Sequence, residues 1–156
     1  MILDNIPKDQ VNAMFQRGIL DESPSVAATC VSAICLYLED YEKPQEYQSI
    51  IDPLLNVLVN LVNSPDSDED LTLKTLGSVS EFALSHAKLF KNQLKSLGEF
   101  VCGVMKSSVE SSVQQALLDF ILTLIEQVHP YSPSLLTYLL TFYVHLTIHN
   151  RTQLSQ

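Results

Sequence analysis

The sequence predicts an all-α fold in which antiparallel helix pairs stack side by side into an array. Three observations lead to this prediction. Apolar residues recur at helical period along the 156 residues, without a convincing run of the two-residue alternation that is typical of strands. Seven prolines separate these apolar stretches, and only four glycines occur, which is few for a fold rich in tight β-turns. The third observation is that the apolar pattern returns at a nearly constant interval.

The prolines and the apolar periodicity predict seven helices, at 8–20, 24–40, 45–63, 69–86, 88–106, 109–128 and 133–149. The second begins at Ser23-Pro24, which provides a serine N-cap and a proline in the first turn. Pro53 falls inside the third pattern, so we expect a kink or a new first turn near Ile51. The acidic turn at 64–68 precedes the fourth helix, where the helix dipole favours negative charge.

Broad apolar stripes identify the later helices. The fourth helix presents Leu71, Thr75, Leu76, Val79, Phe82 and Ala83 on one side. The sixth presents Val113, Leu117, Phe120, Ile121, Leu124 and Val128, and the seventh Leu135, Leu136, Leu139, Leu140, Tyr143 and Val144. Stripes this broad predict helices that contact neighbours on two sides rather than one.

The chain resembles itself at a shift of about 43 residues. Leu54-Leu55-x-x-Leu58 aligns with Leu97-x-x-Phe100-Val101 and then with Leu139-Leu140-x-x-Tyr143. A second apolar motif ends in an acid each time, at Glu39, Glu81 and Glu126. A two-helix unit that repeats in the low-to-middle forties is the signature of HEAT or armadillo-like arrays, and the lack of a clear third helix favours HEAT.

We therefore expect residues 1–156 to form a single HEAT-repeat array, with helix pairs at 8–40, 45–86 and 88–128. The predicted helix at 133–149 would be the first of a further unit. Terminal repeats need a polar outer face, whereas this last helix is strongly apolar. The pattern thus predicts about three to four repeats of a longer solenoid, with self-association through its exposed ends.

The net charge of −9 is unevenly distributed. Residues 1–70 carry −10 and residues 71–156 carry +1. Negative surfaces repel nucleic acid and anionic lipid, so we expect protein partners with basic segments, although solubility alone would also explain the charge. No apolar run reaches the length of a membrane span, and the first ten residues do not resemble a signal peptide. The three cysteines are expected to be small buried side chains.

Residues that could support catalysis or metal binding form no convincing group. His145 and His149 have a spacing at which two imidazoles can share a metal, but no third ligand or general base accompanies them. Asp66, Asp68 and Asp70 have the spacing that begins an EF-hand loop, but the required glycine and glutamate are missing. Phosphate-binding and nucleophile motifs are not found. We expect a protein that is not an enzyme and that uses no metal or cofactor.

Four segments resemble the importin-β (karyopherin-β) family of nuclear transport receptors. The stretch from Phe15 to Val26 resembles the family's helix, Asp-containing turn and Val-led second helix, and Asp66–Lys74 resembles a turn of the same kind. Phe82–Leu94 is similar to a linker that carries a bulky residue before the next helix. Gln114–Glu126 is most similar to a helix of the karyopherin beta three, or importin five, type.

This resemblance implies a right-handed HEAT superhelix that captures protein cargo in the cytoplasm and releases it to Ran-GTP in the nucleus. It also implies shuttling through the nuclear pore. The sequence departs from the usual HEAT pattern because Ala27, the region of Thr72 and Lys74, and Gln114 stand where many units have the arginine of an Asp–Arg ladder. The family's Ran-contacting N-terminal domain is not recognisable in this chain.

Four acids are candidate cargo-binding residues. The resemblance implies that second helices line the concave face, where Glu39, Glu81 and Glu126 would occupy equivalent places and Asp119 would precede the last of them. Such a track suits an extended basic segment such as a nuclear localisation signal. The simpler alternative is that these acids only solvate the surface. A different class of function also remains open, a scaffold or regulatory HEAT subunit of a phosphatase, chromosome or vesicle-coat assembly, with no dependence on Ran.

Overall fold

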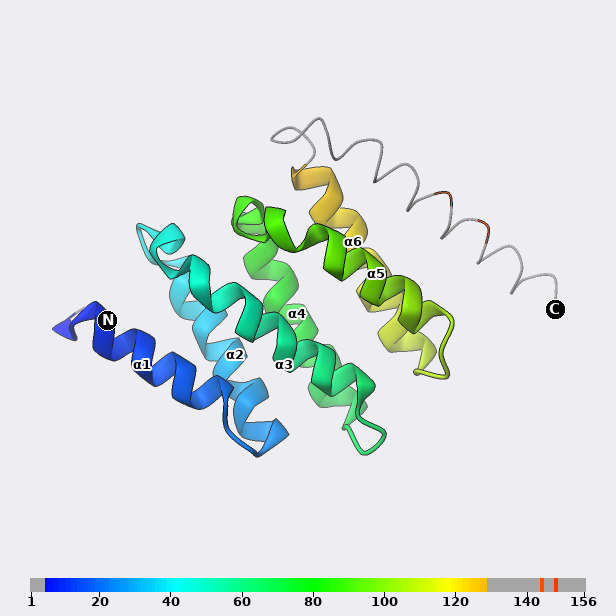
Figure 1. Ribbon diagram of the computed structural model, residues 1–156, viewed down its shortest axis with the longest axis horizontal. Coiled ribbons are helices and arrows are strands. Elements are labelled where there is room, and N and C mark those ends of the chain that lie inside the picture. Colours follow the sequence, from blue (N-terminus) through cyan, green and yellow to red (C-terminus); the bar gives the residue numbers. More distant parts are fainter. Residues whose placement is uncertain (1–4, 129–143, 145–147, 149–156) are drawn as a thin grey trace.

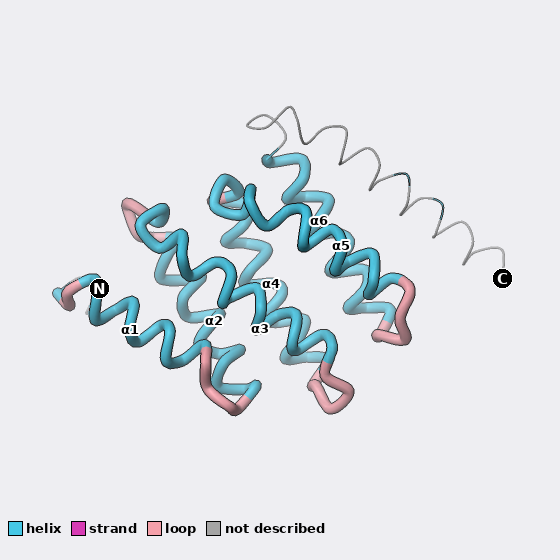
Figure 2. The backbone as a smooth tube through the Cα atoms, viewed as in Figure 1, coloured by secondary structure: helices cyan, strands magenta, loops and turns pink. Residues whose placement is uncertain are grey.

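The computed structural model describes residues 5–128 and the two single residues 144 and 148. The predicted helix at 133–149, and with it His129, His145 and His149, falls almost entirely outside these residues. Every regular element in the described part is helical (Figures 1 and 2). The order is α1 (Lys8–Ile19), α2 (Pro24–Glu39), the 3₁₀ segment η2 (Pro44–Ile50), α3 (Ile51–Asn63), α4 (Glu69–Ser85), the 3₁₀ segment η3 (Ala87–Gln93), α5 (Leu94–Met105) and α6 (Ser111–Val128).

The helices form two layers, as Figure 1 shows. The first-helix layer contains α1, η2–α3 and η3–α5, and the second-helix layer behind it contains α2, α4 and α6. α2 packs closely on α4 and α4 on α6, whereas the helices of the first layer contact one another much less. Closer packing on one side of a stack makes that side the inner one. This arrangement confirms the predicted all-α HEAT-type solenoid.

Two of the predicted helices are divided. The sequence predicted continuous helices at 45–63 and 88–106, but each begins as a 3₁₀ segment and becomes α-helical only at Ile51 and Leu94. A 3₁₀ helix has three residues per turn, so every third side chain lies on one face. The residues buried at that period are Pro44, Tyr47 and Ile50 in η2 and Ala87, Phe90 and Gln93 in η3, and Leu89 is the one further buried residue of the two segments. Burial at this three-residue interval favours the tighter helix, and apolar periodicity alone did not reveal it.

Pro53 explains only the first of these divisions. α3 begins at Ile51, so Pro53 stands in its first turn, where a missing backbone N–H leaves no hydrogen bond unmade. The predicted new turn near Ile51 is therefore confirmed. The second division has no proline, yet α5 begins at Leu94, 43 residues after Ile51. The break belongs to the repeat itself.

One continuous core runs through all three helix pairs. Ile34, Leu58, Phe82, Phe90 and Leu117 have essentially no exposed surface. All six apolar positions predicted for the sixth helix are buried. Each unit buries its apolar faces against the next, which is the physical reason that such repeats fold only as a stack.

The first turns differ from the sequence prediction in one detail. Ser23 occupies the N-cap of α2 and Pro24 follows it, as predicted, but the Ser23 hydroxyl makes no capping bond. The Ser23 backbone N–H instead donates to Asp21 Oδ1 at 2.8 Å. Asp68 caps α4, where its carboxylate accepts from the Asp70 N–H at 2.9 Å.

The cysteine prediction holds for one residue. Cys35 is buried, whereas Cys30 and Cys102 are half-buried, and all three thiols are free. None of the described helices combines the length and the apolarity that crossing a bilayer requires.

Candidate functional site

The two layers differ in charge. The second-helix layer carries six acids and one base, a net charge of −5. The first-helix layer carries four acids and five bases, a net charge of +1. The charged residues of the second layer are Glu39, Glu69, Asp70, Glu81, Asp119, Glu126 and Lys74. Among the helices, the negative charge therefore lies on the second-helix layer, while the loops between helices carry a further −5.

A groove of about 320 Å³ lies between α2 and α4. Glu39 and Glu81 both line it, together with the exposed side chain of Leu36. Cys35 lines the same groove, and burial and, to a lesser degree, the charge of Glu39 raise the pKa of its thiol to about 12. The structure therefore brings two of the four predicted acids to one groove.

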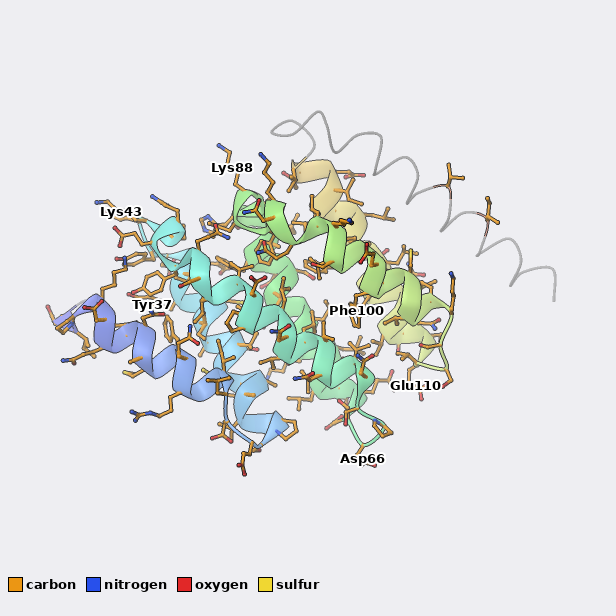
Figure 3. All side chains as sticks on the ribbon, viewed as in Figure 1. Tyr37, Lys43, Asp66, Lys88, Phe100 and Glu110 are labelled. Atoms are coloured by element: carbon orange, nitrogen blue, oxygen red, sulfur yellow. The ribbon has the colours of Figure 1, made fainter. Side chains whose placement is uncertain are left out.

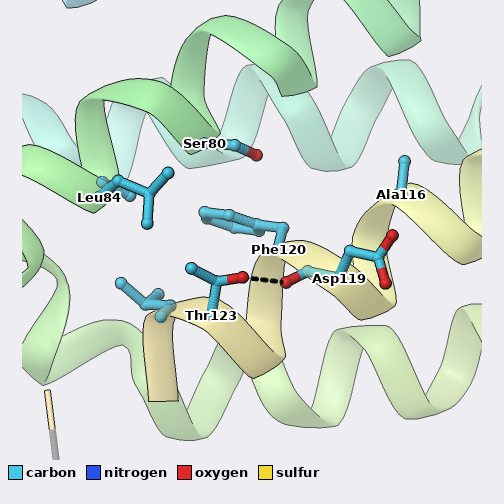
Figure 4. Close-up of a pocket in the computed structure, with 8 residues that line it drawn as sticks. Ser80, Leu84, Ala116, Asp119, Phe120 and Thr123 are labelled. Carbon is cyan, nitrogen blue, oxygen red and sulfur yellow. Dashed lines mark hydrogen bonds between the residues drawn. The ribbon is translucent and has the colours of Figure 1, made fainter. Parts of the chain in front are cut away.

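A second groove, of about 270 Å³, lies between α4 and α6 (Figure 4). Asp119, Phe120 and Thr123 line it from α6, and Ser80 and Leu84 line it from α4. The dashed line in Figure 4 marks the bond from the Thr123 hydroxyl to the Asp119 backbone oxygen, which is 2.8 Å long.

The carboxylate of Asp119 has a partner on its own helix. Gln115 Nε2 donates to Asp119 Oδ1 at 3.0 Å, one helical turn away. Glu126 is exposed near the end of α6 but lines neither groove. The four predicted acids therefore share a layer but not one continuous groove.

Two exposed leucines accompany the acids, and the sequence analysis did not single them out. Leu36 is 65% exposed and Leu84 is 49% exposed, and each lines one of the grooves. A signal was present in the sequence, because both lie off the apolar stripe that their helices bury. Recognising it required knowledge of which stripe faces the core.

Short polar contacts connect neighbouring second helices. Ser78 Oγ of α4 donates to Ser32 Oγ of α2 at 3.1 Å. Ser112 Oγ of α6 donates to a carboxylate oxygen of Glu69 on α4. The serine side chains are small enough for the helices to approach closely, and Glu69 takes part in one of these contacts.

No cluster of three histidine, cysteine, aspartate or glutamate side chains within the described residues is arranged to hold a metal ion. Of the aspartates at 66, 68 and 70, Asp68 caps α4.

Comparison with protein families decides which proteins this chain is related to. A family model described as "IPO5-like, TPR repeats" matches residues 5–100. The chain belongs to this IPO5-like family. The match covers α1 to α4 and the first part of α5, and therefore includes the groove with Glu39 and Glu81. Comparisons with curated proteins and with solved structures gave no match.

Membership confirms the importin-five-type resemblance that the sequence indicated. The family description names TPR repeats, whose period is about 34 residues. Here Pro44 and Ala87 begin equivalent segments 43 residues apart, which is the spacing of HEAT units. The importin-5-like family consists of nuclear transport receptors rather than enzymes, so its repeats act by binding other proteins.

Proposed function

We propose that this chain is part of a nuclear import receptor and binds basic segments of protein cargo on its second-helix layer. The observation that carries the proposal is the excess of six acids over one base on α2, α4 and α6, in a chain of the IPO5-like family. Lysines and arginines of an extended cargo segment would face Glu39, Glu81, Asp119 and Glu126.

The surroundings of the acids support an extended basic segment rather than a single ion. Leu36 and Leu84 offer apolar surface beside the carboxylates. Lysine and arginine pack their aliphatic stems on such surface while their charged ends remain in water. Each exposed ion pair contributes only about 0.2–1 kcal/mol, so affinity depends on several pairs acting together and falls as salt rises.

Binding of a lysine-rich peptide tests the proposal. Fluorescence anisotropy with a labelled nuclear-localisation-type peptide would compare the unaltered chain with the variant Glu81→Lys plus Glu126→Lys, at low and at high salt. We expect the variant to bind markedly more weakly at low salt, and the difference to shrink at high salt because screening weakens both complexes.

A matched control separates position from net charge. Asp9→Lys plus Glu99→Lys changes the charge by the same amount on the first-helix layer, where both residues are exposed. This control should retain most of the affinity. Equal binding by the unaltered chain and the Glu81/Glu126 variant at low salt would refute the acidic track, whereas equal loss in both variants would reduce it to a general charge effect.

The proposal extends to the whole receptor. Cargo would be captured in the cytoplasm, carried through the nuclear pore and released when Ran-GTP binds the complete protein, of which this array is one segment. An immunoblot with an antibody to this chain should detect a native protein several times larger than 17.4 kDa. Ran-GTP added to that protein should release the basic cargo, while a scaffold subunit would keep its partners.

A further inference from the structure

The outer end of the first repeat contains a depression of about 520 Å³, separate from the acidic grooves. It lies where the N-terminal part of α1, the end of α2 and η2 meet, near the labels of Tyr37 and Lys43 in Figure 3. Its lining combines aromatic rings, carboxylates and ammonium groups, contributed by Ile6, Lys8, Tyr37, Asp40, Tyr41, Glu42, Lys43, Glu46 and Tyr47.

Three tyrosine rings form one side of this depression. Tyr37 and Tyr41 are stacked with centroids 5.5 Å apart. Tyr47 meets Tyr41 edge to face at 5.3 Å and Tyr37 at 6.1 Å. Tyr37 and Tyr47 are almost completely buried and Tyr41 is half-buried, so the core holds two of the rings in fixed positions. Burial, with smaller contributions from Tyr37, Tyr41 and Glu46, raises the pKa of Tyr47 well above its usual range, so its ring stays neutral.

A lysine of the same chain already occupies the depression. Lys8 Nζ lies 5.8 Å from the centroid of the Tyr47 ring and 3.3 Å from Glu46 Oε2. The Tyr41 hydroxyl donates to the same Glu46 oxygen at 3.3 Å. An aromatic face beside a carboxylate is an arrangement that attracts organic cations. The contacts of Lys8 show that the Tyr47 ring and the Glu46 carboxylate together bind an ammonium group.

The lysine is loosely held. The side chains of Lys8 and Glu46 are 46% and 35% exposed, and ion pairs as open as this contribute little to stability. Three carboxylates line the depression, from Asp40, Glu42 and Glu46, against the two ammonium groups of Lys8 and Lys43. Displacement of Lys8 would therefore leave an aromatic site with uncompensated negative charge.

We propose that this depression is a second recognition site, which binds an arginine or lysine side chain of a protein partner in competition with Lys8. The incoming cation lies against Tyr41 and Tyr47 and pairs with Glu46, while Lys8 moves into solvent. The residues of the site line neither acidic groove, although Asp40 directly follows Glu39 of the cargo track at the end of α2. The proposal does not depend on whether that track binds basic segments.

Titration with a blocked Gly-Gly-Arg-Gly-Gly peptide tests this proposal. The 156-residue chain would be followed by NMR through the assigned ring signals of Tyr41 and Tyr47 at low salt. The matched probe replaces arginine by citrulline, which keeps the shape of the side chain and removes its charge. We expect saturable shifts of both rings with the arginine peptide and essentially none with the citrulline peptide.

Two variants report the roles of single side chains. Lys8→Met removes the internal competitor and should tighten binding of the arginine peptide. Tyr41→Leu keeps a bulky apolar side chain without a π face and should weaken binding by about two- to five-fold. Thermal unfolding monitored by circular dichroism checks that each variant folds. Glu46→Gln gives a further test if Tyr41→Leu does not fold, since loss of the carboxylate charge should also weaken binding.

The outcomes separate this site from the acidic track. If the citrulline peptide shifts the two rings as strongly as the arginine peptide, or if Lys8→Met leaves the affinity unchanged, the proposal is wrong. It is also wrong if the arginine peptide shifts only signals of α4 and α6. In the variant Glu81→Lys plus Glu126→Lys, the arginine peptide should still shift the ring signals of Tyr41 and Tyr47. The result for this site can therefore be interpreted even if the acidic track does not bind cargo.

Discussion

The first-helix and second-helix layers are built from the same repeat but differ in helix geometry, packing and charge. In the first layer two of the three helices begin with a 3₁₀ segment, and the charges nearly balance. In the second layer the helices are α-helical from end to end, pack closely on one another and carry a net charge of −5. The irregular helix starts of the second and third units lie in the first layer, and the regular second layer holds side chains at repeated positions.

The junction between the layers shows how this division is maintained. η3 of the first layer inserts Phe90 against Phe82 of α4, with ring centroids 5.8 Å apart in an edge-to-face arrangement. Gln48 Nε2 of η2 donates to the backbone oxygen of Leu89 at 2.7 Å, and Gln93 Nε2 donates to Asp52 Oδ1 at 3.1 Å. The 3₁₀ segments thus connect consecutive repeats as well as the two layers.

The largest expected effect comes from truncating this aromatic contact. Phe82→Ala and Phe90→Ala each remove a ring with no exposed surface and should lower the free energy of unfolding by about 3–5 kcal/mol. Urea unfolding of both variants and of the double variant measures the coupling. Phe100, which is only half-buried, provides the control, since Phe100→Ala should cost less. A much smaller loss for Phe90→Ala than for Phe82→Ala would mean that the 3₁₀ segment collapses onto the cavity, and the layers would then be less firmly joined.

Two glycines of the first layer differ in how closely another helix approaches them. A Cβ at Gly18 of α1 would overlap Cys30 Sγ of α2, whereas a Cβ at Gly103 of α5 would meet nothing within 4 Å. Gly18→Ala should therefore destabilise by about 1–3 kcal/mol, while Gly103→Ala should stabilise by up to about 1 kcal/mol because alanine favours the helix.

Thermal unfolding of these two variants, with and without Cys30→Ala, sharpens the comparison. The shorter alanine at position 30 should relieve most of the cost of Gly18→Ala and leave the effect of Gly103→Ala unchanged. If Gly18→Ala proves neutral on its own, α1 is able to shift away from α2, and the first pair is less tightly packed than its geometry indicates.

Alkaline pH tests the groove between α2 and α4. The pKa of Cys35 is raised from 9.0 to about 12 in the folded chain, so its thiol ionises first in the unfolded state. The associated stability is complete below pH 9 and is lost progressively as pH rises from 9 towards 12. At pH 10 the loss should be on the order of 1 kcal/mol.

Comparison with Cys35→Ala isolates this group. The variant loses some packing at every pH, but its stability should fall less between pH 8 and pH 10 in urea titrations than that of the unaltered chain. Parallel curves would show that Cys35 is accessible to water in the groove. Glu39→Gln should change the slope only slightly, because burial contributes more than the charge of Glu39.

The smallest expected effects concern the helix starts of the second layer. Asp68→Ala removes a capping bond from α4 and should destabilise by about 1 kcal/mol. Ser23→Ala should change stability much less, because the Ser23 side chain makes no such bond at α2. Chemical denaturation of the two variants in parallel compares them. Equal losses would indicate that the Ser23 hydroxyl contributes to α2 in solution.

Much of the fold could be predicted from the sequence because its signals are local. The helix starts at Pro24 and Glu69, the buried stripe of α6 and the repeat of about 43 residues all depend on spacing along the chain. The acidic character of the candidate site was predictable for the same reason. The 3₁₀ starts were not, because residues such as Ala87, Phe90 and Gln93 fit an α-helical pattern nearly as well as a three-residue one.

The sequence by itself determined the fold class and the repeat, since apolar period and proline placement restrict a chain of this composition to stacked helix pairs. The family rested on the resemblance of particular segments and on the family-model match over residues 5–100. Only the tertiary structure decided which acids share a groove. Glu39 and Glu81 are separated by a whole repeat and come together because α2 packs on α4, while Glu126 lies outside both grooves. It also brought Lys8 onto Tyr47 and Glu46, a contact that depends on how α1 crosses η2. Side chains far apart in the chain meet only through packing, and no local pattern encodes that meeting.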